Sequence, residues 1–299
     1  MKKFVALLLA ALMMTSALAS AETVVTSFYP IHLLARNLLE GIEGIELASL
    51  AEPTSGCLHD YQLQTGDMKT LARADVFLIN GAGMEGYLEG VFEAFPTLPV
   101  VDASQDVTLL EDCSDHGHED DDHDHDHAFN AHIWLDAENA AQMVANLADG
   151  LIAALPQHEA AITANRDAYT ARLTALDAEL TAAMANLPHK DIITFHEAFP
   201  YFASAYGLNV AAVINRDPDD ALSPRQLAEL CKSVKALGAP PLFVEPQYED
   251  MAATTISRET GAPLFTLDPI VTGPADAPLT YYEDIMRQNL SVLLSALGE

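Results

Sequence analysis

Residues 156–187, "PQHEAAITANRDAYTARLTALDAELTAAMANL", carry the strongest indication of how this chain folds. It contains no glycine, and its only proline opens it. At about 1.5 Å of rise per residue, a helix of some thirty residues would span roughly 45 Å, which is long for a helix inside one small domain. The pattern predicts either one rigid helix that joins two lobes or two shorter helices with a break, and we favour the first. Apolar residues recur along it at helical spacing, namely Tyr169, Leu173, Leu176, Leu180 and Leu187.

The segments before and after this helix share a similar plan. Short apolar runs alternate with helical patterns in both, which predicts parallel strands covered by helices on both faces. The expected strands cover residues 23–28, 45–51, 75–81 and 99–104 before the helix, and 191–195, 208–214, 241–245 and 263–268 after it. The sequence therefore predicts an α/β fold with two lobes, each a mostly parallel sheet flanked by helices. We expect the lobes to cover 22–155 and 188–299, joined by the helix at 156–187.

Local signals mark several helix ends. Pro30 is expected to start a helix that Gly41 ends. Ser223, Pro224 and Gln226 form a capping-box start for the helix between two expected strands of the second lobe.

The first 21 residues resemble a secretory signal peptide. Lys2 and Lys3 precede an apolar run, and "ASA" at 19–21 is a small-residue cleavage site. The run is short for a membrane span, and no stop-transfer pattern follows it. Position 22 is glutamate rather than cysteine, so a lipid anchor is not indicated. We therefore expect a soluble mature protein that is periplasmic or otherwise exported.

The charge of the chain is strongly acidic. It has 14 basic and 44 acidic residues among 299, a formal net charge of -30. Nucleic acid is excluded as an expected partner, because binding it needs clustered lysine and arginine. An acidic excess attracts cations, although a generally acidic proteome would explain the bulk charge equally well.

Residues 112–127 form an acidic, histidine-rich segment. Its only apolar residue is Cys113, so it cannot bury a core, and we expect a mobile loop. The loop either binds zinc weakly in several arrangements or is a solvated charge run without function. Its histidines are His116, His118, His123, His125 and His127.

The chain has three cysteines. Cys231 lies in a helical run and is expected to be a buried free thiol. Cys57 and Cys113 lie in turn or loop sequence near histidines, and export permits a disulfide, so they are the candidate pair.

Four potential metal ligands lie near ends of predicted elements. His59 follows the strand at 45–51 through a turn, and His132 precedes "IWL" and a helix cap at Asp136. His196 follows the strand at 191–195, and Asp268 ends the strand at 263–268. Taken singly, three of them have a plain structural explanation: His59 as a loop histidine, His132 as a packing histidine at a helix entry and Asp268 as a turn aspartate. Ligands gather beyond the carboxyl ends of strands in open α/β sheets, and three imidazoles with one carboxylate suit four-coordinate Zn(II).

Five stretches together resemble one protein family. They are "GCLHDYQLQTGDMKTLARADVFLINGAGME", "NAHIWLD", "ITFHEAFPYFASAYGL", "FVEPQ" and "LDPI". In this order, over essentially the whole mature chain, they look like the metal-binding solute-binding proteins of ABC importers, in the zinc/manganese group. An acidic, histidine-rich insertion before the second ligand is typical of its zinc members.

The resemblance implies a fold, a ligand set and a function. The family fold is two α/β lobes joined by one long helix. The family's metal histidines fall on His59, His132 and His196, and Asp268 occupies the usual place of a more variable carboxylate ligand. Cys57 departs from the family's small residue or proline, which supports a local disulfide. The implied function is capture of Zn(II) outside the membrane and delivery to an ABC permease and its ATPase, by a protein that we expect to be monomeric.

Other classes of protein remain as alternatives. Glu197 beside His196 could act as a base in a zinc enzyme, but the sequence has no HExxH, GxSxG or GxxxxGK[ST] motif, and we expect no enzyme. The alternatives are a manganese or other divalent-metal solute-binding protein and an exported metal buffer or adhesin. Zinc is preferred over manganese for the three imidazoles, the histidine-rich loop and the general affinity order of divalent metals.

Overall fold

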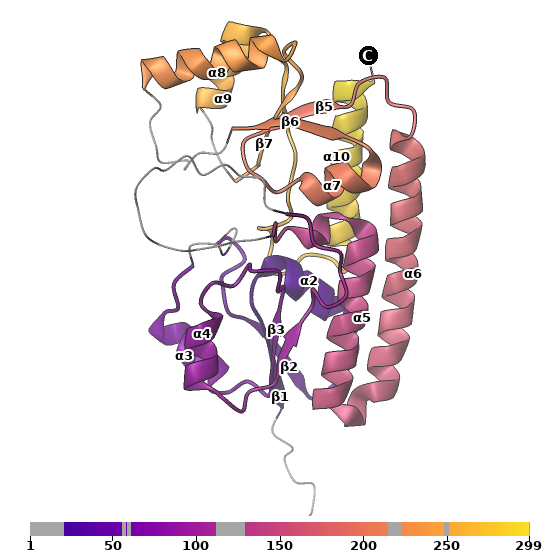
Figure 1. Cartoon of the computed structure of the whole chain (residues 1–299). Helices are drawn as coiled ribbons and strands as arrows, with labels where there is room; N and C mark the ends of the chain where they lie inside the picture. Colours follow the sequence, from indigo (N-terminus) through magenta and orange to yellow (C-terminus); the bar gives the residue numbers. More distant parts are fainter. Residues whose placement is uncertain are drawn as a thin grey trace, which may run out of the picture.

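The computed structural model describes residues 21–55, 58, 61–111, 129–214, 223–247 and 251–298. Within these ranges the chain forms two α/β lobes, with two long helices running side by side along one flank (Figure 1). This confirms the fold class expected from the sequence. Residues 1–20 of the expected signal peptide lie outside the described residues.

The first lobe is built on a parallel sheet with the strand order β2-β1-β3-β4. Its central strands are buried on both faces, which explains their unbroken apolar sequence. The elements up to the long helices are β1 (Glu22–Thr26), α2 (Tyr29–Leu38), β2 (Ile45–Ser49), α3 (Thr65–Leu71), β3 (Val76–Ile79), α4 (Leu88–Ala94), β4 (Val100–Asp102) and the 3-10 turn η1 (Ile133–Leu135).

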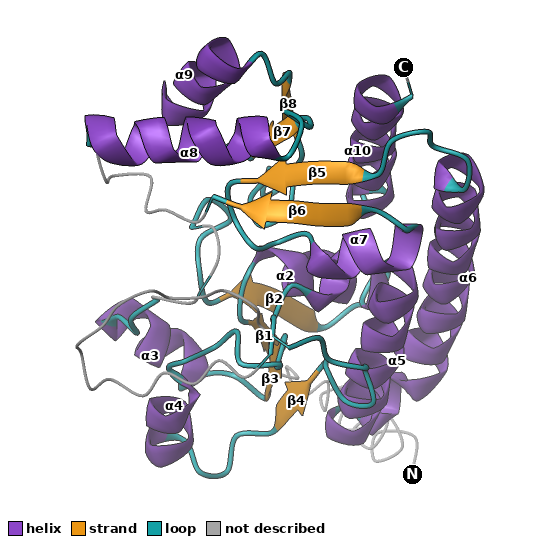
Figure 2. Ribbon diagram, turned by 45° about the horizontal axis from the view of Figure 1, so that its top comes forward, coloured by secondary structure: helices purple, strands orange, loops and turns teal. Residues whose placement is uncertain are grey.

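The second lobe repeats this plan with the order β6-β5-β7-β8, again all parallel. The two sheets lie apart in Figure 2, each with its own helices. The elements are β5 (Asp191–Thr194), α7 (Pro200–Tyr206), β6 (Asn209–Val213), α8 (Pro224–Ala236), β7 (Leu242–Val244), α9 (Met251–Thr260), β8 (Leu264–Thr266) and α10 (Tyr281–Leu297).

The helix that connects the two sheets is a single element. After α5 (Ala137–Ala154) and the 3-10 turn η2 (Pro156–His158), α6 runs without a break over Glu159–Met184. Its 26 residues correspond to about 39 Å at 1.5 Å of rise each. The structure thus decides between the two alternatives in favour of one long helix, which lies against α5 beside the first lobe and contacts α10 beside the second (Figures 1 and 2).

One continuous apolar cluster runs through both lobes. It includes Val24 and Val76 of the first sheet and Ile192 and Phe243 of the second. Because the lobes share this core, separating them widely would expose apolar surface. The cluster also contains Trp134, which is fully buried.

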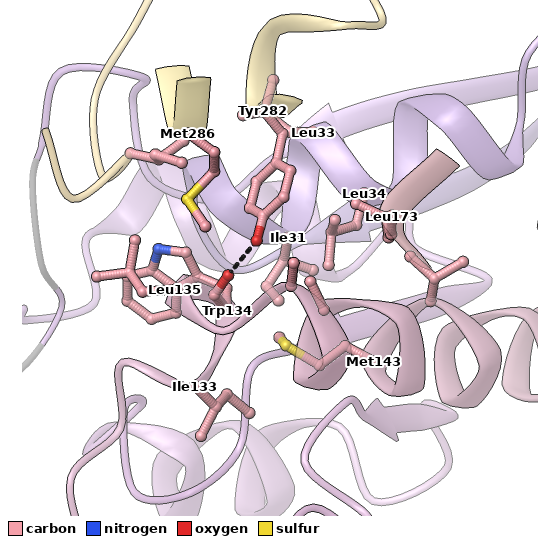
Figure 3. Close-up of a cluster of buried hydrophobic side chains, with 14 of the residues drawn as sticks. Ile31, Leu33, Leu34, Ile133, Trp134, Leu135, Met143, Leu173, Tyr282 and Met286 are labelled. Carbon is pink, nitrogen blue, oxygen red and sulfur yellow. Dashed lines mark hydrogen bonds between the residues drawn. The ribbon is translucent and has the colours of Figure 1, made fainter. Parts of the chain in front are cut away.

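Figure 3 shows how Trp134 is held within this cluster. The Tyr282 hydroxyl of α10 donates to the Trp134 carbonyl at 2.6 Å, and Met286 lies beside the indole. Phe28 meets the indole edge to face, with ring centroids 5.3 Å apart. The segment after His132 is therefore firmly packed.

The local signals for helix ends are largely confirmed. The Ser223 hydroxyl accepts from the Gln226 N–H, and the Gln226 side chain accepts from the Ser223 N–H, which completes the capping box of α8. Asp136 caps α5 by accepting from two backbone N–H groups. The helix after β1 begins one residue earlier than expected, at Tyr29, and ends at Leu38 before the left-handed Gly41.

In the part of the chain that the structure describes, no helix is long and apolar enough to cross a lipid bilayer.

Candidate metal centre

The second lobe places two ionisable side chains at the ends of neighbouring strands. His196 lies two residues after β5, and Glu245 follows β7 directly. These strands pair side by side in the middle of the sheet, where the chain connections change direction. In open α/β sheets this is the point where ligands bind.

His196 and Glu245 form a close pair. His196 Nδ1 lies 2.7 Å from Glu245 Oε1, and the Glu245 side chain is only 3% exposed. The other carboxylate oxygen accepts from the Gln247 amide. A neutral imidazole that donates from Nδ1 carries its lone pair on Nε2, and a buried carboxylate in this role is typical behind a metal-binding histidine.

The surroundings of His196 raise its pKa above the usual value. Burial alone would lower this pKa, but the hydrogen bond to Glu245 and the negative charges of Glu245 and Glu197 outweigh it. Glu245 therefore both orients the ring and increases its affinity for a cation.

His132 is completely buried and is oriented by Asn130. Asn130 Oδ1 accepts from the His132 backbone N–H at 3.0 Å and lies 3.2 Å from His132 Nδ1. Because an amide oxygen only accepts, Nδ1 carries the proton and Nε2 the lone pair. The same Asn130 donates through Nδ2 to the Glu197 carbonyl at 2.8 Å, so it links His132 to the residue next to His196.

The two imidazoles meet between the lobes. The ring centroids of His132 and His196 are 4.8 Å apart and the rings are nearly perpendicular, at 84°. One ring precedes the entry to α5 and the other follows β5. The structure thus brings together two of the four side chains expected at the site.

The segment that carries His132 is held by Asn80, which is in turn held by the buried carboxylate of Glu85. Asn80, directly after β3, donates through Nδ2 to the Ala131 carbonyl at 2.9 Å. Glu85 accepts from the Asn80 and Gly81 backbone N–H groups at 2.7 and 3.1 Å. Burial raises the pKa of Glu85 to about 7 despite these hydrogen bonds.

Asp268 follows β8 by two residues and is partly buried. Burial raises its pKa, the hydrogen bond from the Ile270 N–H opposes this, and the charge of Glu245 adds to it. Within the described ranges no three His, Cys, Asp or Glu side chains are grouped so that they could hold a metal ion. Among the described residues, Asp268, His132 and His196 therefore do not form a complete metal-binding group.

Several expected residues lie outside the described part of the chain. They are His59, the candidate disulfide partners Cys57 and Cys113, and the loop histidines His116, His118, His123, His125 and His127. Their proposed roles stay predictions. Cys231 is described, and the expectation of a buried free thiol is confirmed.

Sequence reasoning missed three residues that form hydrogen bonds with candidate ligands: Asn130, Glu245 and Asn289. Glu245 could have been found, because it ends the expected strand 241–245 just as Asp268 ends 263–268. Asn130 lies two residues before His132 and carried no separate signal. Asn289 lies in the middle of α10, and its contact with Asp268 depends entirely on tertiary packing.

Comparison with known proteins agrees with this architecture. Two α/β lobes with parallel sheets, joined by a long helix and with one histidine from each lobe meeting, are the architecture of the metal-binding solute-binding proteins of zinc/manganese ABC importers, and the family match supports this class. A family model described as "ZnuA: Zinc-uptake complex component A periplasmic" matches residues 24–296, and the chain belongs to this family. The resemblance seen in the sequence motifs is thereby confirmed.

Individual relatives differ in the metal they name. The chain is 29% identical over 288 residues to "Zinc-binding protein AdcA" of Streptococcus pyogenes, covering 90% of this chain and 55% of that protein. It is 26% identical over 281 residues to "Manganese-binding lipoprotein MntA" of Halalkalibacterium halodurans, covering 92% and 88%. A solved structure of FpvC from P. aeruginosa with Ni2+ has a TM-score of 0.77 and 26% identity, covering 92% and 96%. The chain thus spans little more than half of the AdcA relative.

Proposed function

We propose that this protein captures Zn(II) outside the cytoplasmic membrane, between its two lobes, with His59, His132, His196 and Asp268 as ligands. The observation that carries the proposal is the meeting of His132 and His196, with ring centroids 4.8 Å apart. Each ring has its Nδ1 engaged by an oxygen acceptor, Asn130 or Glu245, which directs Nε2 to the metal.

The first lobe would supply His59 and His132, and the second lobe His196 and Asp268. Four protein ligands close the first coordination shell, which favours holding a metal ion over reacting with it. We therefore infer a binding protein rather than an enzyme, and Glu197 has no assigned chemical role.

Ligands in both lobes would couple metal binding to delivery of the metal to a membrane partner. A small change in the relative position of the lobes would alter the coordination of the metal and the surface that a partner meets. The continuous core along α5, α6 and α10 favours small tilts over a wide hinge motion. The partners would be an ABC permease and its ATPase in the cytoplasmic membrane, with this protein acting as an exported monomer after cleavage of residues 1–21.

Manganese is the second candidate, because one relative of similar length is described as manganese-binding. Carboxylate oxygens suit Mn(II), whereas imidazoles and the general affinity order favour Zn(II). Three imidazoles against one carboxylate support zinc for this chain.

The test is the metal content of the protein after native purification, paired with competition titrations of Zn(II) and Mn(II). We expect one tightly held zinc per chain and a much weaker affinity for manganese. Tighter binding of manganese than of zinc would identify Mn(II) as the metal that the protein captures. Many weak sites without a tight one would favour a metal buffer.

A further inference from the structure

The turn that carries Asp268 has an unusual backbone. Ile270, two residues on, has a φ of +60° and is completely buried. Positive φ is rare and costly for a β-branched residue, so such a conformation persists only where its surroundings fix it. The Asp268 carboxylate takes part, because its Oδ1 accepts from the Ile270 N–H at 2.8 Å.

Two side chains from elsewhere in the chain fix this turn. Asn289 of α10 accepts from the Asp268 N–H through Oδ1 at 2.9 Å and donates through Nδ2 to the Asp268 carbonyl at 2.7 Å. Trp134 donates through Nε1 to the Pro269 carbonyl at 2.8 Å. Asn289 is 1% exposed, so no water competes for these bonds. Both backbone groups of Asp268 are thus bound by one rigid amide.

This arrangement determines where the Asp268 carboxylate can point. Its Oδ1 accepts from the Ile270 N–H, which ties the carboxylate to its own turn while leaving lone pairs for a ligand. The two hydrogen bonds from Asn289 fix the peptide groups on both sides of the Asp268 Cα, and so fix the direction in which its side chain leaves the backbone.

We propose that Asn289 is a positioning residue for the metal site, which holds the strained turn so that the Asp268 carboxylate faces the cation. The inference rests on the proposed function. It adds a residue from α10, 21 residues after Asp268 in the sequence, whose effect on the metal passes through Asp268.

A double-mutant cycle tests this dependence. Zinc affinity is measured at pH 7.5, by competition with a chromophoric chelator, for wild type, Asn289→Leu, Asp268→Ala and the double variant. We expect each single variant to bind zinc about tenfold more weakly, the lower end of the range for losing a residue that orients a metal ligand. The double variant should bind no more weakly than Asp268→Ala alone, because Asn289 has nothing left to position.

Asn37 provides a matched structural control. It is also a buried asparagine on a helix, and its Nδ2 donates to a loop carbonyl, that of Leu279, at 3.1 Å. Asn37→Leu should lower the Tm of the metal-free protein and leave its zinc affinity unchanged. If Asn289→Leu does not fold, Asn289→Ser, which removes the amide but keeps a small polar group, takes its place in the cycle.

The outcomes separate this inference from the proposed function. A loss in the double variant that equals the product of the two single losses, about a hundredfold, would overturn it, as would unchanged affinity in the Asn289 variant. Unchanged affinity in Asp268→Ala, with strong loss in His196→Ala, would also overturn it while leaving the two-lobe zinc site in place. Unchanged affinity in His196→Ala would contradict the proposed function itself.

Discussion

His196 Nδ1 lies 2.7 Å from the buried Glu245 Oε1, a carboxylate–imidazole pair built from the ends of two adjacent parallel strands. The pair is complete within the second lobe. The first lobe orients His132 differently, through the neutral amide of Asn130. The two lobes would therefore contribute histidines of different basicity to one metal.

Removing the Glu245 carboxylate should weaken zinc binding without removing a ligand. Glu245→Ala leaves His196 in place but frees its ring to rotate and removes the charge that favours a bound cation. We expect a 10- to 100-fold loss of zinc affinity in a competition titration, the usual effect of losing such a partner.

Glu229→Ala is the control, because Glu229 is an exposed glutamate on α8 whose side chain pairs with Arg225. Its zinc affinity should equal that of wild type. Equal affinities for the Glu245 and Glu229 variants would show that the carboxylate does not support a metal-binding histidine.

Zinc binding should weaken as the pH falls, beginning above pH 6.5. The surroundings of His196 raise its pKa, so protons compete with the metal at higher pH than for an ordinary imidazole. The raised pKa of Asp268 acts in the same direction. Affinity measured from pH 8 to pH 5 should fall steeply, and Glu245→Gln should move the fall to lower pH because it removes the charge that raises the pKa of His196.

The folding stability of the metal-free protein should change with pH in the opposite direction to the zinc affinity, because of the His196–Glu245 pair. A raised pKa in the folded state means that protonated His196 contributes stability at low pH, which is lost as the pH rises through that pKa.

For the zinc affinity, a flat profile between pH 5 and pH 8 would argue against histidine ligands.

The substitution Gly150→Ala tests how closely α5 packs on the first sheet. A Cβ at Gly150 would lie 2.3 Å from Val101 Cγ1 of β4, so Gly150→Ala should overpack this contact. We expect it to destabilise the protein by about 1–3 kcal/mol, against the usual gain for this change within a helix. Chemical denaturation measures the difference.

Gly90→Ala is the matched control, since Gly90 is also helical but its Cβ would meet nothing within 4 Å. It should stabilise the protein by about 0.5–1 kcal/mol. Stabilisation by both changes would show that α5 does not lie as close to β4 as the structure places it.

Deleting residues 114–127 should leave one tight zinc site per chain and remove weaker ones. The sequence of residues 114–127 offers no apolar side chain to anchor its histidines, and ordering a backbone costs roughly 1–2 kcal/mol per residue. Isothermal titration of the deletion variant, with its circular dichroism unchanged, should show a single tight equivalent. Loss of that equivalent would mean that the loop supplies a primary ligand.

The fold could be predicted further from the sequence than the site. The unbroken apolar spacing of residues 156–187 and the apolar runs on either side predicted one long helix and two parallel sheets, because periodicity and burial are local properties. His132 and His196 could be selected by their places at element ends. Asn130, which contacts His132, and Asn289, which contacts Asp268, could not be selected, because asparagine is ordinary in loops and helices and its role here depends on contacts formed only in the folded chain.

The most direct test of a zinc site between the lobes is a competition titration of wild type and His196→Ala at pH 7.5. His196 belongs to the second lobe and meets His132 of the first, so its loss removes a ligand that the first lobe cannot replace. We expect wild type to hold one zinc per chain tightly and His196→Ala to bind it orders of magnitude more weakly, with an unchanged circular dichroism spectrum. Superimposable competition curves for the two proteins would contradict the account.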